Sequence, residues 1–155
     1  ELSMYLAIIS FISLFLHSGN VAEYKFDLTR EKYITLRFTI DKDELIHLKL
    51  NNGCDVKQLT ALCTSTYLND QTEVWINLKM INFELEDSHS ERNHFILNLK
   101  SKQTIKEINT FKIIANGFYE FESKFKNRII LEFLSQKKSF LLNNVKNNLF
   151  LKIQP

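Results

Sequence analysis

The chain has 155 residues, of which 25% are charged, 45% hydrophobic and 12% aromatic, and its formal net charge is +2. This composition is typical of one globular domain and excludes a disordered chain; three glycines and one proline exclude collagen-like and proline-rich chains. The nearly balanced charge gives no electrostatic basis for nucleic-acid binding, so we expect no nucleic-acid partner.

The first 22 residues differ in composition from the rest of the chain. Residues 4–16 form an uncharged apolar run, shorter than the roughly twenty residues that a membrane-spanning helix needs. The run and the small and polar residues 17–22 are typical of a secretory signal peptide, although no basic residue precedes the run. The position of Met4 indicates that residues 1–3 precede the start of translation.

We therefore predict a signal peptide over residues 1–22, a domain over residues 23–155, secretion and no stable membrane anchor. The alternative interpretation of the apolar run is an N-terminal strand or helix that is buried in the domain.

Alternation of apolar and polar residues with a period of two predicts β-strands from Tyr24 onward. In Tyr33 to Ile40 every second residue is apolar, and the residues between them, such as Thr35 and Arg37, face the other side. Further strands are predicted at residues 44–50, 59–66, 73–81, 94–99, 111–115, 118–125, 129–134, 139–142 and 148–153.

Turn residues separate these runs, and Asn116-Gly117 predicts the clearest hairpin, between 111–115 and 118–125. No segment shows a sustained helical period, and the best candidate for a short helix or turn is near residues 129–136. About ten short strands predict an all-β fold, an antiparallel β-sandwich of two sheets.

Cys54 and Cys63 are nine positions apart. In an oxidising compartment they can form a disulfide, and closing so short a loop stabilises a protein by about 2–3 kcal/mol. They can equally remain free thiols, with Cys63 buried in an apolar strand. The sequence leaves both alternatives open.

Several short segments resemble the carbohydrate-recognition domain of galectins. Residues 111–117, Phe-Lys-Ile-Ile-Ala-Asn-Gly, are similar to the family's Phe-Lys-Val-x-Val-Asn-Gly segment, and residues 125–128, Phe-Lys-Asn-Arg, to its Phe-x-x-Arg. Residues 75–80 resemble the fifth strand, and residues 148–153 fall where the family's final strand lies. The resemblance covers roughly residues 24–153 and implies a galectin-like jelly roll.

The resemblance also implies a sugar site, which galectins build from His-x-Asn-x-Arg, an asparagine on the next strand, and Trp-Gly-x-Glu-x-Arg. Cys63, Ser65 and Tyr67 stand at the three positions of the first pattern, and none of them matches. Asn77 matches the asparagine of the next strand.

The third pattern falls within residues 83–92 and lacks its tryptophan. If Arg92 is aligned with its arginine, Ser90 takes the place of the glutamate; if Glu91 is aligned with the glutamate, Asn93 takes the place of the arginine.

Trp75, the only tryptophan, shares a strand face with Asn77 if the period of two continues. An indole there can stack on a sugar ring, or it can simply cover the outside of the sheet. The candidate carbohydrate-binding surface is a concave sheet bearing Tyr67, Trp75, Asn77, Glu91 and Arg92.

We expect a secreted lectin that binds glycans or glycoproteins, β-galactosides among them, without covalent chemistry. The alternative, favoured by the missing galactose-binding residues, is a galectin-fold module or effector that binds a protein partner and has lost sugar binding. Oligomers would suit a lectin that cross-links its ligands.

No motif for a nucleophile or an acid pair is present, so we expect no enzyme and no cofactor. The spacing of His89, Glu91 and His94 matches no paired-histidine zinc motif, so we expect no metal.

Overall fold

The structure is a computed structural model that describes residues 20–45, 60–133 and 137–153. Cys54, most of the predicted signal peptide and almost all of the predicted strand at 44–50 lie outside the described residues. The described elements are β1 (Val21–Leu28), β2 (Tyr33–Asp41), α3 (Thr60–Gln71), β3 (Thr72–Ile76), β4 (Lys79–Met80), β5 (Phe83–Glu91), β6 (His94–Thr104), β7 (Thr110–Ala115), β8 (Lys126–Leu131), β9 (Lys138–Leu142) and β10 (Asn148–Lys152).

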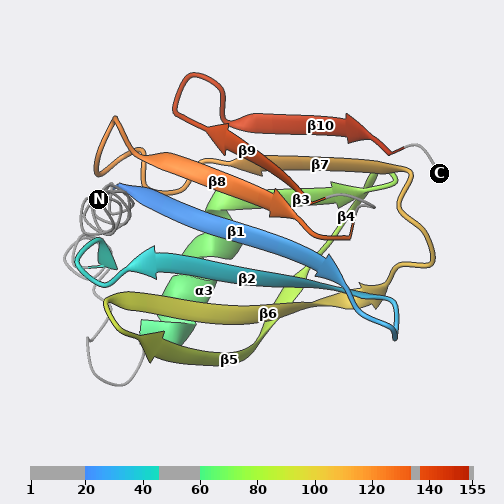
Figure 1. The fold of residues 1–155 in the computed structure, drawn as a ribbon, viewed down its shortest axis with the longest axis horizontal. Coiled ribbons are helices and arrows are strands. Elements are labelled where there is room, and N and C mark those ends of the chain that lie inside the picture. Colours follow the sequence, from blue (N-terminus) through green and yellow to red (C-terminus); the bar gives the residue numbers. More distant parts are fainter. Residues whose placement is uncertain (1–19, 46–59, 134–136, 154–155) are drawn as a thin grey trace, which may run out of the picture.

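The strands form two sheets that pack face to face (Figure 1). One sheet has six strands in the order β5-β6-β2-β1-β8-β9, and the other has four in the order β10-β7-β3-β4. The predicted all-β sandwich of two sheets is confirmed. Its neighbouring strands are antiparallel except β1 and β8, which run parallel, with Ala22 beside Asn127.

The sandwich core follows from the period-two patterns of the sequence. In β2, Ile34, Leu36, Phe38 and Ile40 are all buried, as the alternation predicts. Aromatic rings join the two sheets: the ring centres of Phe26 on β1 and Phe111 on β7 lie 5.3 Å apart, edge to face. The sheets are therefore held together by large apolar side chains that every second strand position supplies.

The first described strand reaches back to the predicted cleavage point. β1 begins at Val21, and Ala22, the last residue of the predicted signal peptide, is fully buried. Cleavage after Ala22 therefore falls inside β1, and the signal peptide stays a prediction.

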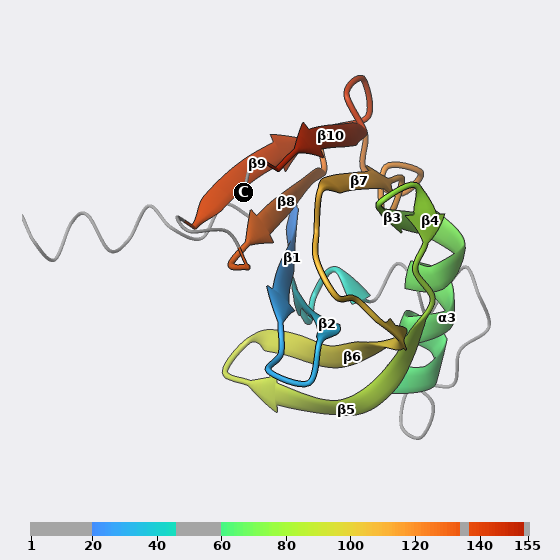
Figure 2. The same cartoon turned by 90° about the vertical axis from the view of Figure 1, so that its right-hand side faces the viewer.

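The predicted strand at 59–66 is wrong, because residues from Thr60 onward form α3. Tyr67 and Leu68 of this helix are buried in the common core, and the helix contacts β5 of one sheet and β3 of the other. Figure 2 shows α3 along the side of the sandwich between β5 and the β3–β4 pair, which it closes. Alternation in a short apolar run does not distinguish a strand from a buried helix segment.

The predicted hairpin at Asn116-Gly117 is also wrong. β7 pairs instead with β3 and β10, and residues 116–125 form turns rather than a strand. Phe118 and Phe125 are each 1% exposed, with ring centres 4.9 Å apart. The seven-residue separation would place these two rings on opposite faces of a strand, whereas the turns bring both into the same core. Gly117 lies tight against this core, since a Cβ there would come within 3.2 Å of the Tyr24 hydroxyl.

The predicted single strand at 73–81 is two strands. β3 ends at Ile76 and β4 begins at Lys79, with Trp75 paired to Met80 across the hairpin. The connecting residues Asn77 and Leu78 have φ angles of 50° and 64°. Positive φ at both central residues is the requirement of a type I′ turn, whose twist matches that of the strands it joins.

Candidate functional site

Tyr67, the first predicted sugar-binding residue, lies in the core. It is 8% exposed, and its hydroxyl donates to Glu120 Oε1 at 2.6 Å while accepting from the backbone N–H of Phe118 at 2.7 Å. Burial, together with the hydrogen bond to Glu120, raises the pKa of Tyr67. This side chain ties α3 to the turns that follow β7, and it does not face a ligand surface.

Trp75 and Asn77 lie in or beside β3, in the four-stranded sheet. The Trp75 ring is partly exposed on the outward face; its Nε1 donates to Glu73 at 3.1 Å, and Lys112 Nζ lies 5.7 Å from the ring centre. Asn77 belongs to the turn, so the alternation that should place it beside Trp75 ends one residue before it.

The Asn77 amide fastens the β3–β4 hairpin to the segment that leads into β7. Its Oδ1 accepts from the backbone N–H groups of Asn109 and Thr110 at 2.8 and 3.0 Å, and its Nδ2 donates to the carbonyl of Glu107 at 2.9 Å. Three bonds use most of the hydrogen-bonding capacity of one amide. Asn77 therefore acts as a local clamp.

Glu91 and Arg92 lie at the end of β5 and in the turn to β6, in the other sheet. Glu91 Oε2 is 3.7 Å from the guanidinium of Arg37, and Arg92 has a φ of 53°. The structure therefore distributes the five predicted residues over a helix, the four-stranded sheet and the rim of the six-stranded sheet. It does not bring them together on one concave surface.

A concave surface does exist, on the outward face of the six-stranded sheet. Figure 2 shows this sheet bending from β9 to β5, away from the four-stranded sheet. The bend encloses a hollow of about 360 Å³. It is lined by Lys25, Asp27, Thr35, Leu36, Arg37, Glu86, Asp87, Asn98, Leu99 and Glu132.

The middle of the hollow is one row of cross-strand neighbours. The register pairs Lys25 of β1 with Arg37 of β2, Arg37 with Asn98 of β6, and Asn98 with Asp87 of β5. These residues face outward because their chain neighbours, such as Phe26 and Leu99, are buried on the inner face. Four strands thus present four polar side chains side by side.

A bulge in β5 adds a further carboxylate to this row. The pairing with β6 shifts between Leu85 and Asp87, so Glu86 is the extra residue of the strand. Bulges redirect side chains relative to the regular pleat. As a result both Glu86 and Asp87 line the hollow, although consecutive strand residues ordinarily face opposite sides.

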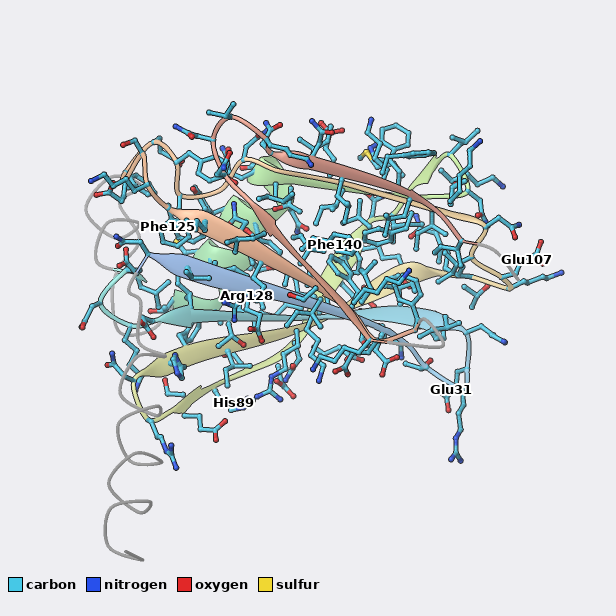
Figure 3. All side chains as sticks on the ribbon, turned by 45° about the horizontal axis from the view of Figure 1, so that its top comes forward. Glu31, His89, Glu107, Phe125, Arg128 and Phe140 are labelled. Atoms are coloured by element: carbon cyan, nitrogen blue, oxygen red, sulfur yellow. The ribbon has the colours of Figure 1, made fainter. Side chains whose placement is uncertain are left out.

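Hydrogen bonds and ion pairs hold these side chains in place. Asn98 Nδ2 donates to Asp87 Oδ1 at 2.6 Å, and Lys25 Nζ lies 2.8 Å from Glu132 Oε2. Hydrogen bonds from Lys25 and Lys137 lower the pKa of Glu132. Arg128 on β8 and His89 on β5, both labelled in Figure 3, lie in the next row toward the edge of this face.

The hollow mixes donors and acceptors at short range. Lys25, Arg37 and Asn98 donate, while the carboxylates of Asp27, Glu86 and Asp87 accept. Such a surface can bind a neutral ligand that carries several hydroxyl groups. Among the described residues, no group of three or more His, Cys, Asp or Glu side chains could hold a metal ion.

These lining residues were not among the predicted site residues, although the sequence carries a signal for them. The alternation in residues 33–40 already placed Thr35 and Arg37 opposite the core face. The sequence did not supply the strand order, which places β1 and β6 on either side of β2 and β5 beside β6. Without that order, outward polar residues of separate strands look like ordinary solvent-facing positions.

Neither a protein-family model nor a curated protein matches this chain. The segments that resemble galectins have mixed placements: residues 111–115 lie in β7, residues 116–117 in the turn after it, and residues 61–67 in α3. The aligned positions of the galactose-binding triad therefore lie on a helix, and the galectin assignment stays a prediction. Within the described ranges, no helix has the length and apolar character needed to cross a membrane.

Proposed function

We propose that this protein is a secreted, galectin-like lectin that binds glycans non-covalently in the hollow of the six-stranded sheet. The observation that carries the proposal is the cross-strand row of Lys25, Arg37, Asn98 and Asp87 at the centre of a concave face. Secretion is supported by the apolar run at residues 4–16 and by Cys63, which is disulfide-bonded.

Sugars suit this hollow because each ring presents neighbouring hydroxyls that both donate and accept hydrogen bonds. The guanidinium of Arg37 and the amide of Asn98 can each contact two such oxygens, and Asp27 and Asp87 can accept from hydroxyls. A volume of about 360 Å³ lies in the range of small-ligand sites, so the hollow has room for a short oligosaccharide.

The affinity we expect is modest. None of the ten lining residues is aromatic, so no ring is available to stack on the apolar face of a sugar. Trp75, the predicted stacking platform, belongs to the other sheet. Binding would therefore depend on hydrogen bonds in an open, hydrated site, where each bond contributes about 0.5–1.5 kcal/mol.

A glycan array followed by calorimetry on the best ligands tests the proposal. Asn98→Ala and Arg37→Ala should each weaken binding about tenfold, because each removes donors from the central row. The matched controls Asn144→Ala and Arg30→Ala remove the same groups from exposed turns away from the hollow and should leave binding unchanged.

Lactose competition and Trp75→Ala separate the remaining outcomes. Binding that lactose displaces would support a β-galactoside ligand, whereas binding only to other glycans would keep the lectin function and discard that ligand. Loss of binding in Trp75→Ala, with Asn98→Ala unaffected, would move the site to the four-stranded sheet. A folded sample that binds no glycan would overturn the proposal and favour a protein partner.

A further inference from the structure

The outward face of the four-stranded sheet carries a row of large side chains. The register pairs Phe150 of β10 with Lys112 of β7, Lys112 with Trp75 of β3, and Trp75 with Met80 of β4. Directly opposed residues of antiparallel strands lie on the same face. These four residues, here called the Trp75 row, therefore cross the whole sheet with one residue from each strand.

The apolar residues on this face are open to solvent. Phe150 is 50% exposed, Met80 is 49% exposed, and Leu78 in the turn before β4 is 79% exposed. Trp75 is partly exposed, and its Nε1 donates to Glu73 at 3.1 Å, so its ring is already ordered. A contiguous exposed apolar patch marks an interaction surface.

The same strands carry an excess of positive charge. β3, β4, β7 and β10 together contain three lysines, Lys79, Lys112 and Lys152, and one carboxylate, that of Glu73. Lys112 belongs to the Trp75 row, Lys152 faces the same side as Phe150 two residues before it, and Lys79 is exposed at the edge of the sheet.

The hollow on the other sheet has the opposite balance, because its lining contains four carboxylates and two basic side chains. The two outward faces of the sandwich, which point in opposite directions in Figure 2, therefore differ in the sign of their charge.

We propose that the outward face of the four-stranded sheet binds reversibly to the surface of a lipid bilayer that contains anionic lipids. Phe150, Met80 and Leu78 enter the boundary between headgroups and acyl chains, and the lysines lie among the headgroups. The strength of such binding depends on the apolar area that is buried and on the attraction to anionic lipids, and this face supplies both. The contact is peripheral and requires no membrane-spanning segment.

The position of the lysines favours a bilayer over a protein partner. Lysine is depleted at protein interfaces and charge is depleted from their cores, whereas Lys112 stands in the middle of the Trp75 row. Tryptophan and lysine both suit the headgroup region of a membrane. The indole is apolar with one polar N–H, and the lysine stem lies along apolar surface while its ammonium group reaches the headgroups.

The charge of the two faces also orients the molecule. An anionic surface attracts the face with the lysines and repels the face with the hollow. The hollow lies on the outward face of the other sheet, so it points away from the bilayer and stays open. The membrane contact therefore does not depend on whether the hollow binds glycans.

Co-sedimentation with vesicles tests the proposal. Vesicles of phosphatidylcholine with about 30% phosphatidylserine should bind the chain at least about tenfold more tightly than vesicles of phosphatidylcholine alone. We expect Phe150→Glu and Met80→Glu, both at half-exposed positions, to weaken this binding at least about tenfold. Leu141→Glu, at a comparably exposed position on β9 in the other sheet, is the control and should bind like the parent.

A folded chain that stays in the supernatant with both kinds of vesicle would overturn the proposal and favour a protein partner for this face. Equal binding to both kinds of vesicle, or binding that neither row variant weakens, would also overturn it.

A lysine variant tests the electrostatic part. Lys152→Gln should weaken binding to the phosphatidylserine vesicles about fivefold, because one cation near an anionic surface is lost. Lys102→Gln, at an exposed position on β6 in the other sheet, is the matched control and should have no effect. An equal loss in both variants would contradict the assignment of the contact to this face.

Fluorescence identifies the face that touches the bilayer, because Trp75 is the only tryptophan of the chain. Its emission should move to shorter wavelength when phosphatidylserine vesicles are added. Unchanged emission from vesicle-bound protein would place the contact elsewhere and overturn the proposal. The vesicles carry no glycan, and Phe150→Glu should bind glycans like the parent, so a failed membrane contact and a failed glycan site give different results.

Discussion

The two sheets of this sandwich share one core but present opposite chemistry to solvent. The outward face of the six-stranded sheet is concave and polar, with Lys25, Arg37 and Asn98 in its central row. The outward face of the four-stranded sheet has Trp75 and Met80 in the corresponding position. Both inner faces bury apolar side chains, because they form the shared core. The outer faces are not constrained in this way, so their differences indicate which ligands or partners each face could bind.

The sharpest contrast is between the inner and outer faces of the four-stranded sheet. Phe111→Ala removes a fully buried ring that contacts Phe26 and Phe133, and should lower the free energy of unfolding by about 3–5 kcal/mol. Phe150→Ala makes the same change on the outward face and should cost less than about 0.5 kcal/mol. Urea denaturation of both variants measures the difference; similar losses would contradict the assignment of inner and outer faces.

The helix that closes the sandwich depends on a buried hydroxyl. Tyr67→Phe keeps the ring but leaves the N–H of Phe118 without its acceptor, so we expect a loss of about 1–3 kcal/mol in unfolding free energy. Tyr33→Phe, on β2 at a partly exposed position, is the matched control and should be nearly neutral. If Tyr67→Phe instead left stability unchanged and abolished glycan binding, Tyr67 would belong to a ligand site.

Substitutions at Asn77 test whether this residue stabilises the β3–β4 hairpin or contacts a sugar. Asn77→Gly permits the positive φ but removes three hydrogen bonds, and should cost about 1–2 kcal/mol of stability. Asn77→Ala should cost more, because alanine also resists that φ. Leu78→Gly, in the same turn, is the control and should be neutral or slightly stabilising. Thermal melts give the stabilities, and a loss of glycan affinity in a stable Asn77→Gly would reverse the interpretation.

The smallest expected effect concerns the charges at the rim of the hollow. The hydrogen bonds from Lys25 and Lys137 lower the pKa of Glu132 from its ordinary value of 4.5. A lowered folded-state pKa contributes stability that is complete above the unfolded value and is lost as pH falls through the folded value. In Glu132→Gln, unfolding free energy should therefore depend slightly less on pH below about 4.5. Glu84→Gln is the control; an equal change in both variants would contradict the effect.

The sequence alone predicted the class of fold, because a strand with one buried face alternates apolar and polar residues with a period of two. The alternation in residues 33–40 became β2 with the predicted inner face, and the patterns at 111–115 and 148–153 became β7 and β10. Each strand's own residues decide which side is apolar, so one strand can be interpreted without its neighbours.

Two segments that were predicted as strands from the sequence have another conformation, which only the tertiary structure reveals. Residues 60–71 form a helix that places Tyr67 and Leu68 in the core, and residues 116–125 form turns that bury Phe118 and Phe125. Both outcomes depend on the space between two sheets, which no local pattern describes.

The candidate site shows the same division. The sequence determined that Lys25, Arg37 and Asn98 each face away from the core, because their strand neighbours are apolar. Only the strand order placed them in one row, and only the bend of the sheet and the bulge at Glu86 made that row a hollow. The side of the sheet that a residue faces is set by the local sequence of its strand. Which strands are neighbours, and how the sheet curves, is set only when strands distant in sequence pair.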